Sequence, residues 1–293
     1  MAQLSANGIQ IEYDTFGEER DRPLLLIMGL GAQMTRWPEL FCQGLAEQGH
    51  YVIRFDNRDV GLSERFEAAG PPDIAAITAA VMAGRDPEVP YTLDDMANDS
   101  AGLLDALALD AAHVCGASLG GMIAQTMAIQ HPDRVLSLTS IMSSTGNRNL
   151  PPPKPEAMAA LMSAPAQDRE GSIARTESIA KIIGSPAYPA NLAELRDRAA
   201  ADFDRSFYPV GVARQMAAAS VQADRRAALA KVQVPALVIH GNEDPLVPVT
   251  GGIDTHEALV RSTLWAVDGM GHDLPKPLWP SIIERIGALT SSG

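Results

Sequence analysis

The run AHVCGASLGG at residues 112–121 constrains the fold of this chain more than any other feature. A short apolar stretch ends in the pattern Gly-x-Ser-x-Gly, and a helical pattern begins directly after it. This combination is typical of a nucleophile elbow, a sharp strand-to-helix turn with serine at its tip. Gly116 and Gly120 lack a Cβ atom, so the strand and the helix can approach closely. The run therefore predicts an exposed Ser118 hydroxyl and a Leu119 N–H directed at a reacting carbonyl.

A chance match in a chain rich in glycine and alanine is the alternative, but the rest of the pattern supports an elbow. Strands alternate with helices, which predicts right-handed crossovers and an α/β fold with a mostly parallel sheet flanked by helices. Asn7-Gly8 predicts a hairpin at the start, and hence an antiparallel edge. Besides the elbow strand, the expected strands are 23–28, 51–55, 135–142, 235–240 and 263–267, and the main helices are 35–48, 92–107, 119–130, 250–260 and 278–289.

The composition changes after Ser143. A proline-rich segment follows, and it cannot be regular structure because successive prolines remove N–H donors and fix φ. From there to about residue 230 the pattern is helical, rich in alanine and without a strand. We therefore expect an inserted helical cap at 144–230, and an α/β core formed by 1–143 and 231–293.

Charge and cysteine content restrict the partners and the compartment. The formal net charge of -13 disfavours binding to nucleic acid or to an anionic membrane surface. No stretch is apolar enough to span a bilayer, and no basic segment followed by an apolar one marks a secretory signal. Cys42 and Cys115 are interpreted as reduced core residues, so a cytoplasmic protein is expected. Cys115 is an alternative nucleophile, disfavoured by its place in a buried strand.

A serine nucleophile needs a base, and His272 is the best candidate. It lies in a glycine-containing loop just after the last expected strand, and catalysis in open α/β sheets occurs at that edge. The alternative is a polar residue at the start of a helix. The remaining histidines are expected to be structural or solvated: His50, His113, His131, His240 and His256.

The acid that orients the base should follow another strand. Asp244 does so, and the chain order Ser118, Asp244, His272 is the order that this kind of fold uses. An Asp-Pro turn is the structural alternative. Glu243 is the nearest rival, and Asp268 is a weaker one because it lies too close in sequence to His272.

A second backbone donor is needed beside Leu119 to bind the oxyanion. The loop after the strand 23–28 can supply the Leu30 N–H, and Gly29 and Gly31 would allow unusual backbone angles there. A simple tight turn is the alternative. Met28 and Gly29 are expected to contact substrate beside this loop.

The pocket itself is expected to be lined by the cap. Apolar residues at helical spacing in the cap usually pack against the core, but a covered site also needs an apolar lining. Flexible side chains such as Met122 and Met216 would suit several substrate shapes. We therefore expect a small-molecule ester that is uncharged and moderately hydrophobic.

Several motifs carry a resemblance to a known family. The chain resembles the α/β-hydrolase superfamily over nearly its whole length, although MGLG at 28–31 departs from the common His-Gly of the oxyanion loop. It is similar to the branch containing aclacinomycin methylesterase, described as carboxylic ester hydrolases with helical caps. The motifs are GASLG at 116–120, FDNRDVGLS at 55–63, HPDRV at 131–135, HGNED at 240–244 and GMGH at 269–272.

The resemblance implies a serine esterase with a Ser118-His272-Asp244 triad and no metal or cofactor. Alternatives on the same triad are a cofactor-free perhydrolase, a lactonase or an acyltransferase. A non-catalytic, ligand-binding member of the fold is a further alternative, disfavoured because binding does not need all three residues. The serine at the elbow disfavours dehalogenase and epoxide hydrolase chemistry, which use a carboxylate there.

Overall fold

A computed structural model describes residues 1–291 and contains one eight-stranded sheet. The spatial order is β1-β2-β4-β3-β5-β6-β7-β8. The pairs β1–β2 and β2–β4 are antiparallel and the other five are parallel, as predicted. The strands are β1 (Ala2–Ala6), β2 (Ile9–Phe16), β3 (Arg22–Ile27), β4 (His50–Phe55), β5 (Ala112–Ala117), β6 (Val135–Ile141), β7 (Ala236–Gly241) and β8 (Ser262–Val267).

The predicted hairpin joins β1 and β2. Asn7 and Gly8 both have positive φ, 50° and 79°. A two-residue turn with positive φ at both positions matches the right-handed twist of the flanking strands, which is why Asn-Gly favours it. The hairpin places the antiparallel strands at one edge of the sheet.

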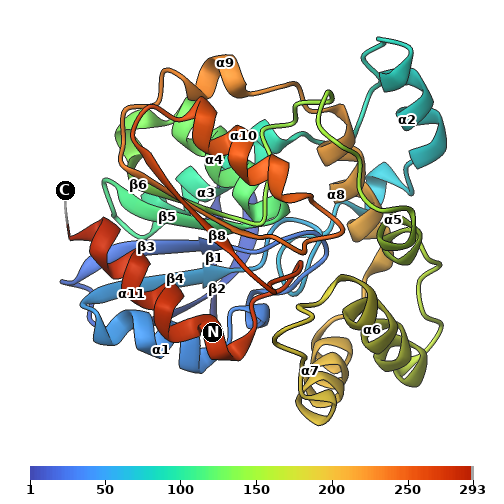
Figure 1. The fold of residues 1–293 in the computed structure, drawn as a ribbon, viewed down its shortest axis with the longest axis horizontal. Coiled ribbons are helices and arrows are strands. Elements are labelled where there is room, and N and C mark those ends of the chain that lie inside the picture. Colours follow the sequence, from blue (N-terminus) through green and yellow to red (C-terminus); the bar gives the residue numbers. More distant parts are fainter. Residues whose placement is uncertain (292–293) are drawn as a thin grey trace.

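Helices cover both faces of the sheet because the strand side chains alternate between two cores. Leu25 and Ile27 of β3 pack with α3 (Leu93–Ala106) and α4 (Leu119–Gln130). Leu24 and Leu26 pack with α1 (Glu39–Glu47) and α11 (Trp279–Thr290) on the other face. Figure 1 shows these two layers, with α10 (Val249–Ala258) on the side of α3 and α4.

One predicted helix is shorter than expected. The helix expected at 35–48 begins only at Glu39, after a single 3-10 turn over Met34–Arg36. Pro38 disfavours the helical conformation at the residue before it, and Trp37 is accordingly extended, with φ -86° and ψ 96°. The side chain of Trp37 is nevertheless fully buried, where it stacks on Phe41.

The segment between β6 and β7 is helical and has no strand among its described residues. Figure 1 shows α5 to α8 gathered at one end of the sheet, and α2 (Ile74–Met82) packs against α8 there. The last helix of the segment, α9, packs instead against α4 and α10. We refer to the segment as the helical insertion, and its helices are α5 (Pro155–Leu161), α6 (Arg169–Ile183), α7 (Leu192–Arg205), α8 (Pro209–Val221) and α9 (Arg226–Leu229).

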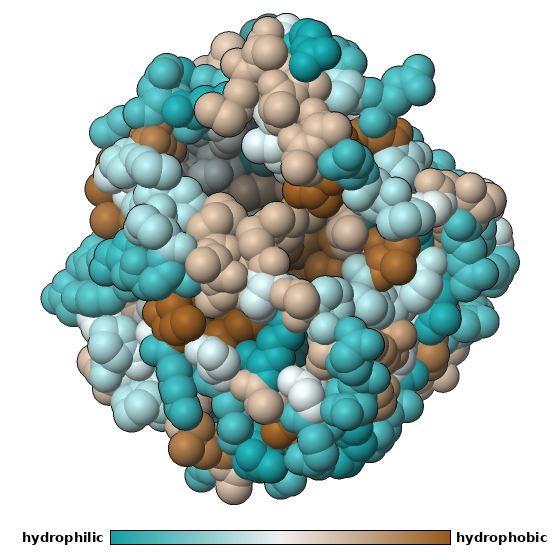
Figure 2. Space-filling model, turned by 90° about the vertical axis from the view of Figure 1, so that its right-hand side faces the viewer, coloured by the Kyte–Doolittle hydropathy of each residue, from teal (hydrophilic) through white to brown (hydrophobic). Residues whose placement is uncertain are grey.

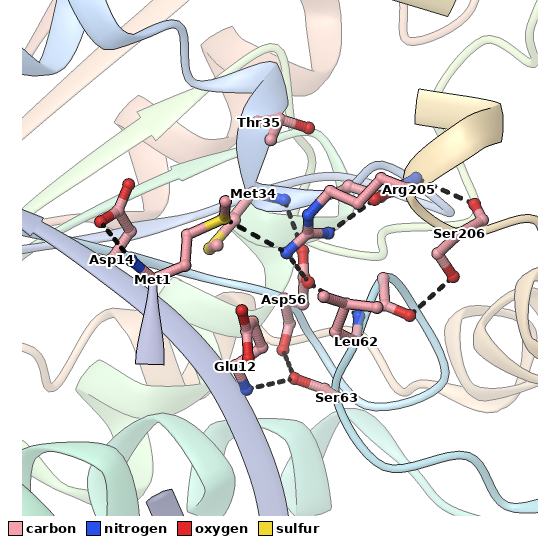
Figure 3. Close-up of polar contacts among 12 residues, drawn as sticks. Met1, Glu12, Asp14, Met34, Thr35, Asp56, Leu62, Ser63, Arg205 and Ser206 are labelled. Carbon is pink, nitrogen blue, oxygen red and sulfur yellow. Dashed lines mark hydrogen bonds and ion pairs between the residues drawn. The ribbon is translucent and has the colours of Figure 1, made fainter. Parts of the chain in front are cut away.

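A buried ion pair ties the helical insertion to the sheet. Asp56 follows β4 and is fully buried, and its carboxylate accepts hydrogen bonds from the backbone N–H groups of Met34 and Leu62. Figure 3 shows Arg205 reaching this carboxylate from the end of α7, with Nη2 2.7 Å from Oδ2. The insertion thus supplies the counter-charge of a carboxylate in the core.

Arg205→Met is therefore expected to lower the free energy of unfolding by about 3–5 kcal/mol, because it leaves the Asp56 carboxylate buried without its cation. The measurement is denaturant unfolding. The control is Arg226→Met, which breaks an exposed pair with Asp224 and should cost much less stability than Arg205→Met. Equal losses for the two variants would contradict the assigned role of the buried pair.

Within residues 1–291, every helix is too short or too polar to cross a bilayer.

Candidate active site

The predicted nucleophile elbow is present at the end of β5. Ser118 has φ 55° and ψ -120°, a strained conformation for a residue other than glycine. A Cβ atom on Gly116 would lie 2.0 Å from the carbonyl oxygen of Gly120. A Cβ atom on Gly120 would lie 2.1 Å from the carbonyl oxygen of Ile27. Only glycine permits this close approach of strand and helix.

A hydrogen-bonded chain joins Ser118, His272 and Asp244. The Oγ of Ser118 lies 3.0 Å from Nε2 of His272, and Nδ1 of His272 lies 2.7 Å from Oδ2 of Asp244. Asp244 is held in place because its Oδ1 accepts hydrogen bonds from the backbone N–H groups of Leu246 and Val247. The carboxylate accepts a hydrogen bond from Nδ1–H, so Nε2 carries no proton and can take one from the serine hydroxyl.

The two rival acids have other partners. Oε2 of Glu243 accepts a hydrogen bond from the Gly269 N–H at 2.6 Å. Oδ1 of Asp268 accepts one from the side-chain amide of Asn242 at 2.5 Å. Both contacts brace the loops after β7 and β8, so among these three carboxylates only Asp244 bonds to His272.

The other five histidines are bonded within the fold, as predicted. Burial lowers the pKa of His50 and of His240, and lowers the pKa of His113 to about 4. His240 also lies 3.6 Å from the Asp244 carboxylate, a contact that the sequence pattern did not indicate. Their partners are Leu45 and Thr290 for His50, Ser137 for His113, Asn98 for His131, Val247 for His240 and Ser262 for His256.

Both thiols are unsuited to nucleophilic attack. Cys42 and Cys115 are free and fully buried. Burial raises the pKa of the Cys42 thiol to about 12, and it raises the pKa of the Cys115 thiol as well. Because the thiolate is the reactive species, these thiols are inert.

Two backbone N–H groups near Ser118 are available as donors. No described residue accepts a hydrogen bond from the Leu30 N–H. Leu119 is the first residue of α4, and the N–H groups of the first turn of a helix have no acceptor within the helix. Gly29 places the loop against the nucleophile, since a Cβ atom there would lie 3.2 Å from Ser118 Cβ.

The expected reason for the two loop glycines is correct for only one of them. Gly31 has φ +63°, so it needs the left-handed region. Gly29 does not have a positive φ. Its lack of a side chain matters because the loop approaches the elbow so closely.

A cavity of about 600 Å³ lies beside this site, between the sheet and the helical insertion. His272, Met28 and Leu30 line it on the sheet side, and Met216 lines it from α8. Figure 2, which looks onto this end of the molecule, shows a hollow with apolar residues around it. Other apolar residues that line the cavity include Val60, Ile74, Met142, Leu161, Met162, Ile179, Ile183, Leu195, Phe203, Phe207, Val212 and Leu274.

Two of the four residues expected to bind substrate do not line the cavity. Gly29 lies against Ser118 instead. Met122 packs against the core on the face of α3 and α4, and its sulfur accepts a hydrogen bond from Gln222. Met122 is therefore a packing residue of α4 and not part of the cavity lining.

The cavity also has charged groups that the sequence reasoning missed. Arg36 and Asp202 form an ion pair at 2.5 Å across the gap between sheet and insertion. Arg198 has a buried Nε without a hydrogen-bond partner in the described part of the chain, and burial lowers its pKa. Asp273 accepts a hydrogen bond from Ser185, and burial raises its pKa. Arg198 and Asp202 lie on α7, but Arg36 and Asp273 come from distant parts of the chain, so no local motif marks the group.

The arrangement of Ser118, Asp244 and His272 is typical of hydrolases that act through a serine nucleophile. Such enzymes place a serine, a carboxylate and a histidine, in this chain order, at the carboxyl ends of parallel strands. The chain belongs to the alpha/beta hydrolase fold family, whose model matches residues 22–275.

Two curated relatives narrow the class. The chain is 29% identical to rhodomycin D methylesterase DauP of Streptomyces sp. (strain C5), over 98% of both chains. It is 27% identical to 3-oxoadipate enol-lactonase 2 of Acinetobacter baylyi, over 89% of this chain and 86% of the relative. These similarities confirm the predicted resemblance and support the predicted class, a carboxylic ester hydrolase.

A solved structure confirms the fold. A meta-cleavage product hydrolase from Pseudomonas fluorescens IP01 matches with a TM-score of 0.77, over 100% of this chain and 98% of that one. The two sequences are 19% identical, so the match concerns the fold alone.

Proposed function

We propose that this protein cleaves a carboxylic ester of a small molecule through an acyl-enzyme on Ser118, with His272 as the base and Asp244 as its orienting acid. The observation that carries the proposal is the hydrogen-bonded chain Ser118–His272–Asp244, with distances of 3.0 Å and 2.7 Å. The relatives named as a methylesterase and an enol-lactonase support the same chemistry.

The proposed reaction has two steps. The Ser118 hydroxyl attacks the acyl carbon while His272 Nε2 takes its proton, and Asp244 stabilises the resulting imidazolium. The N–H groups of Leu30 and Leu119 bind the oxyanion of the tetrahedral intermediate. His272 then protonates the leaving alcohol. Water, deprotonated by the same imidazole, hydrolyses the acyl-enzyme and restores the serine.

The test of this proposal is covalent labelling during ester hydrolysis. The purified protein should hydrolyse p-nitrophenyl butyrate, and an organophosphate should abolish that activity at one equivalent. Mass spectrometry should place the phosphoryl group on the peptide that contains Ser118. Full inactivation with the label on another serine or on Cys115 would contradict the assignment.

We also propose that residues 144–230 act as a cap that selects uncharged, moderately hydrophobic esters. Met28 and Met216 contribute to an apolar lining on both sides of the cavity. Charges of both signs line the cavity, and Arg36 pairs with Asp202 across it. The positive side chains are Arg36, Arg175 and Arg198, and the negative ones are Asp59, Asp202 and Asp273. A charged substrate therefore has no single region of one sign to bind.

The specificity constant for p-nitrophenyl esters should rise with acyl length over short chains and then fall. Each methylene buried in the cavity contributes about 0.8 kcal/mol, which corresponds to about a fourfold increase in kcat/KM per carbon until the cavity is full. The measurement is kcat/KM from acetate to decanoate. A flat profile, or faster hydrolysis of an ester with a charged acyl chain, would contradict the proposed selection.

A lactone is the second candidate substrate, favoured by the similarity to an enol-lactonase. Ring opening uses the same residues, except that the leaving alkoxide stays attached to the acyl group. Comparing kcat/KM for a lactone and for its open-chain ester separates the two. Competition among water, peroxide and alcohols for the acyl-enzyme tests perhydrolase and acyltransferase activity in the same assay.

We propose a cytoplasmic location, supported by the two free buried thiols of Cys42 and Cys115.

A further inference from the structure

We propose that Gln215, a residue of the helical insertion, is a positioning residue that holds the oxyanion loop in its active conformation. The oxyanion loop comprises residues 28–31. The inference rests on the proposed function, because it assumes that the Leu30 N–H binds the oxyanion. It concerns a residue with no direct part in the chemical steps.

Gln215 bonds to the backbone of two loops at once. Its side chain is fully buried in α8. Its Oε1 accepts a hydrogen bond from the Gly31 N–H at 2.8 Å, and its Nε2 donates one to the Arg58 carbonyl oxygen at 2.8 Å. The two bonds use opposite ends of the amide, so only one orientation of the side chain satisfies both.

The bond to Gly31 acts on the peptide unit next to the proposed donor. The Gly31 N–H belongs to the peptide plane that begins at the Leu30 carbonyl, so fixing that plane limits the rotation of Leu30. Asn57 holds the start of the loop by donating to the Met28 carbonyl oxygen. Within the described chain, Gln215 is the side chain that bonds to the backbone at the other end of the loop, at Gly31.

Helix α8 is itself firmly placed against the core. Nε and Nη2 of Arg214 donate to both carboxylate oxygens of Asp59, at 2.8 and 2.7 Å, and both side chains are fully buried. Val212 packs against Gly31 so closely that a Cβ atom on the glycine would lie 2.8 Å from its Cγ2. The loop therefore fits α8 through both polar and apolar contacts.

This arrangement couples the helical insertion to the rate of the chemical step. Oxyanion donors stabilise the transition state only when they are placed correctly, and a displacement of about 1 Å can cost about 10²-fold in rate. Removing the Gln215 amide frees the Gly31 peptide plane and loosens the Leu30 N–H. The loss should therefore fall on kcat, because binding of the substrate by the cavity does not depend on this amide.

The test compares Gln215→Met with Gln125→Met. Gln125, on α4, is also fully buried. Its side chain forms hydrogen bonds with Ser140 and Arg225, and it has no hydrogen bond to the oxyanion loop. Gln215→Met should lower kcat by about 10- to 100-fold with KM within about twofold, on the scale of a misplaced donor. Gln125→Met should lose similar thermal stability but keep kcat within about threefold.

A trifluoromethyl ketone gives the second measurement, because its adduct with Ser118 carries the oxyanion. Its affinity should fall by the same factor as kcat/KM in Gln215→Met. If that variant does not fold, Gln215→Ala gives the same test. Water can enter the space left by the shorter side chain and form hydrogen bonds with the Gly31 N–H and the Arg58 carbonyl oxygen, but it does not fix the loop as the amide does. In the wild-type protein, hydrogen exchange at the Gly31 amide should be slow.

Three results would overturn the inference: kcat within threefold of wild type in the Gln215 variants, equal loss of kcat in Gln125→Met, or rapid exchange at the Gly31 amide. The proposed function would fail differently, by full activity of Ser118→Ala. An inactive Ser118→Ala together with fully active Gln215 variants would reject only the role of Gln215.

Discussion

Ser118→Ala is expected to lower kcat for ester hydrolysis by about 10⁶, the scale found when a serine nucleophile is removed from such a triad. Without the hydroxyl no acyl-enzyme can form, and His272 has no proton to take from the elbow. Residual hydrolysis would come from water bound next to the oxyanion donors. Substrate binding should be little affected, because the hydroxyl contributes almost nothing to the apolar cavity.

The measurement is kcat with p-nitrophenyl butyrate, together with the thermal midpoint to show that the variant is folded. Ser143→Ala is the matched control. Ser143 is another buried serine near the elbow, and its Oγ has no hydrogen-bond partner in the described chain. It should retain kcat within about threefold of wild type, because the hydroxyl that it removes makes no hydrogen bond to the triad. Activity above about 1% of wild type in Ser118→Ala would reject Ser118 as the nucleophile, since the expected loss is about 10⁶.

Asp244→Asn is expected to lower kcat by about 10⁴ with the fold intact. The structure explains why the loss should be so large. The backbone N–H groups of Leu246 and Val247 both donate to the Oδ1 position, so the amide oxygen of the variant has to occupy it. The amide nitrogen then faces His272 Nδ1. The ring proton has to move to Nε2, where it blocks transfer from Ser118.

Glu243→Gln is the control for the neighbouring carboxylate. Its Oε2 accepts a hydrogen bond from the Gly269 N–H, and the amide oxygen of the variant can keep that bond. It should therefore retain kcat within about threefold of wild type, as expected for a change away from the reacting atoms. If Glu243→Gln lost about 10⁴ in kcat while Asp244→Asn stayed active, the acid of the triad would be Glu243 and not Asp244.

Local patterns predicted most of the fold because strands and turns in this chain are encoded by neighbouring residues. The hairpin at Asn7-Gly8 and the elbow at Ser118 both depend on backbone conformations that a few adjacent residues decide. The helix expected at 35–48 was wrong at its start, because its apolar spacing continued through Pro38 while the backbone could not. Periodicity reports which face is apolar, and it does not report where the chain can bend.

The substrate-binding prediction was weaker for a related reason. Met122 and Met216 look alike in the sequence, as flexible apolar residues within helical patterns. The cavity includes Met216 and not Met122, because Met122 packs against the core cluster formed with α3 and α4. The ion pair of Arg36 and Asp202 at the cavity joins residues from distant parts of the chain, and no spacing rule connects them.

The sequence by itself determined the family, the order of strands and helices, and the three candidate residues Ser118, Asp244 and His272. Only the tertiary structure decided that Asp244, and not Glu243, bonds to His272, and that Gln215 bonds to Gly31. The physical reason is that a hydrogen bond depends on side-chain direction within a fraction of an ångström. That direction is decided by how separate helices and loops pack together, which the pattern of residues along one element does not contain.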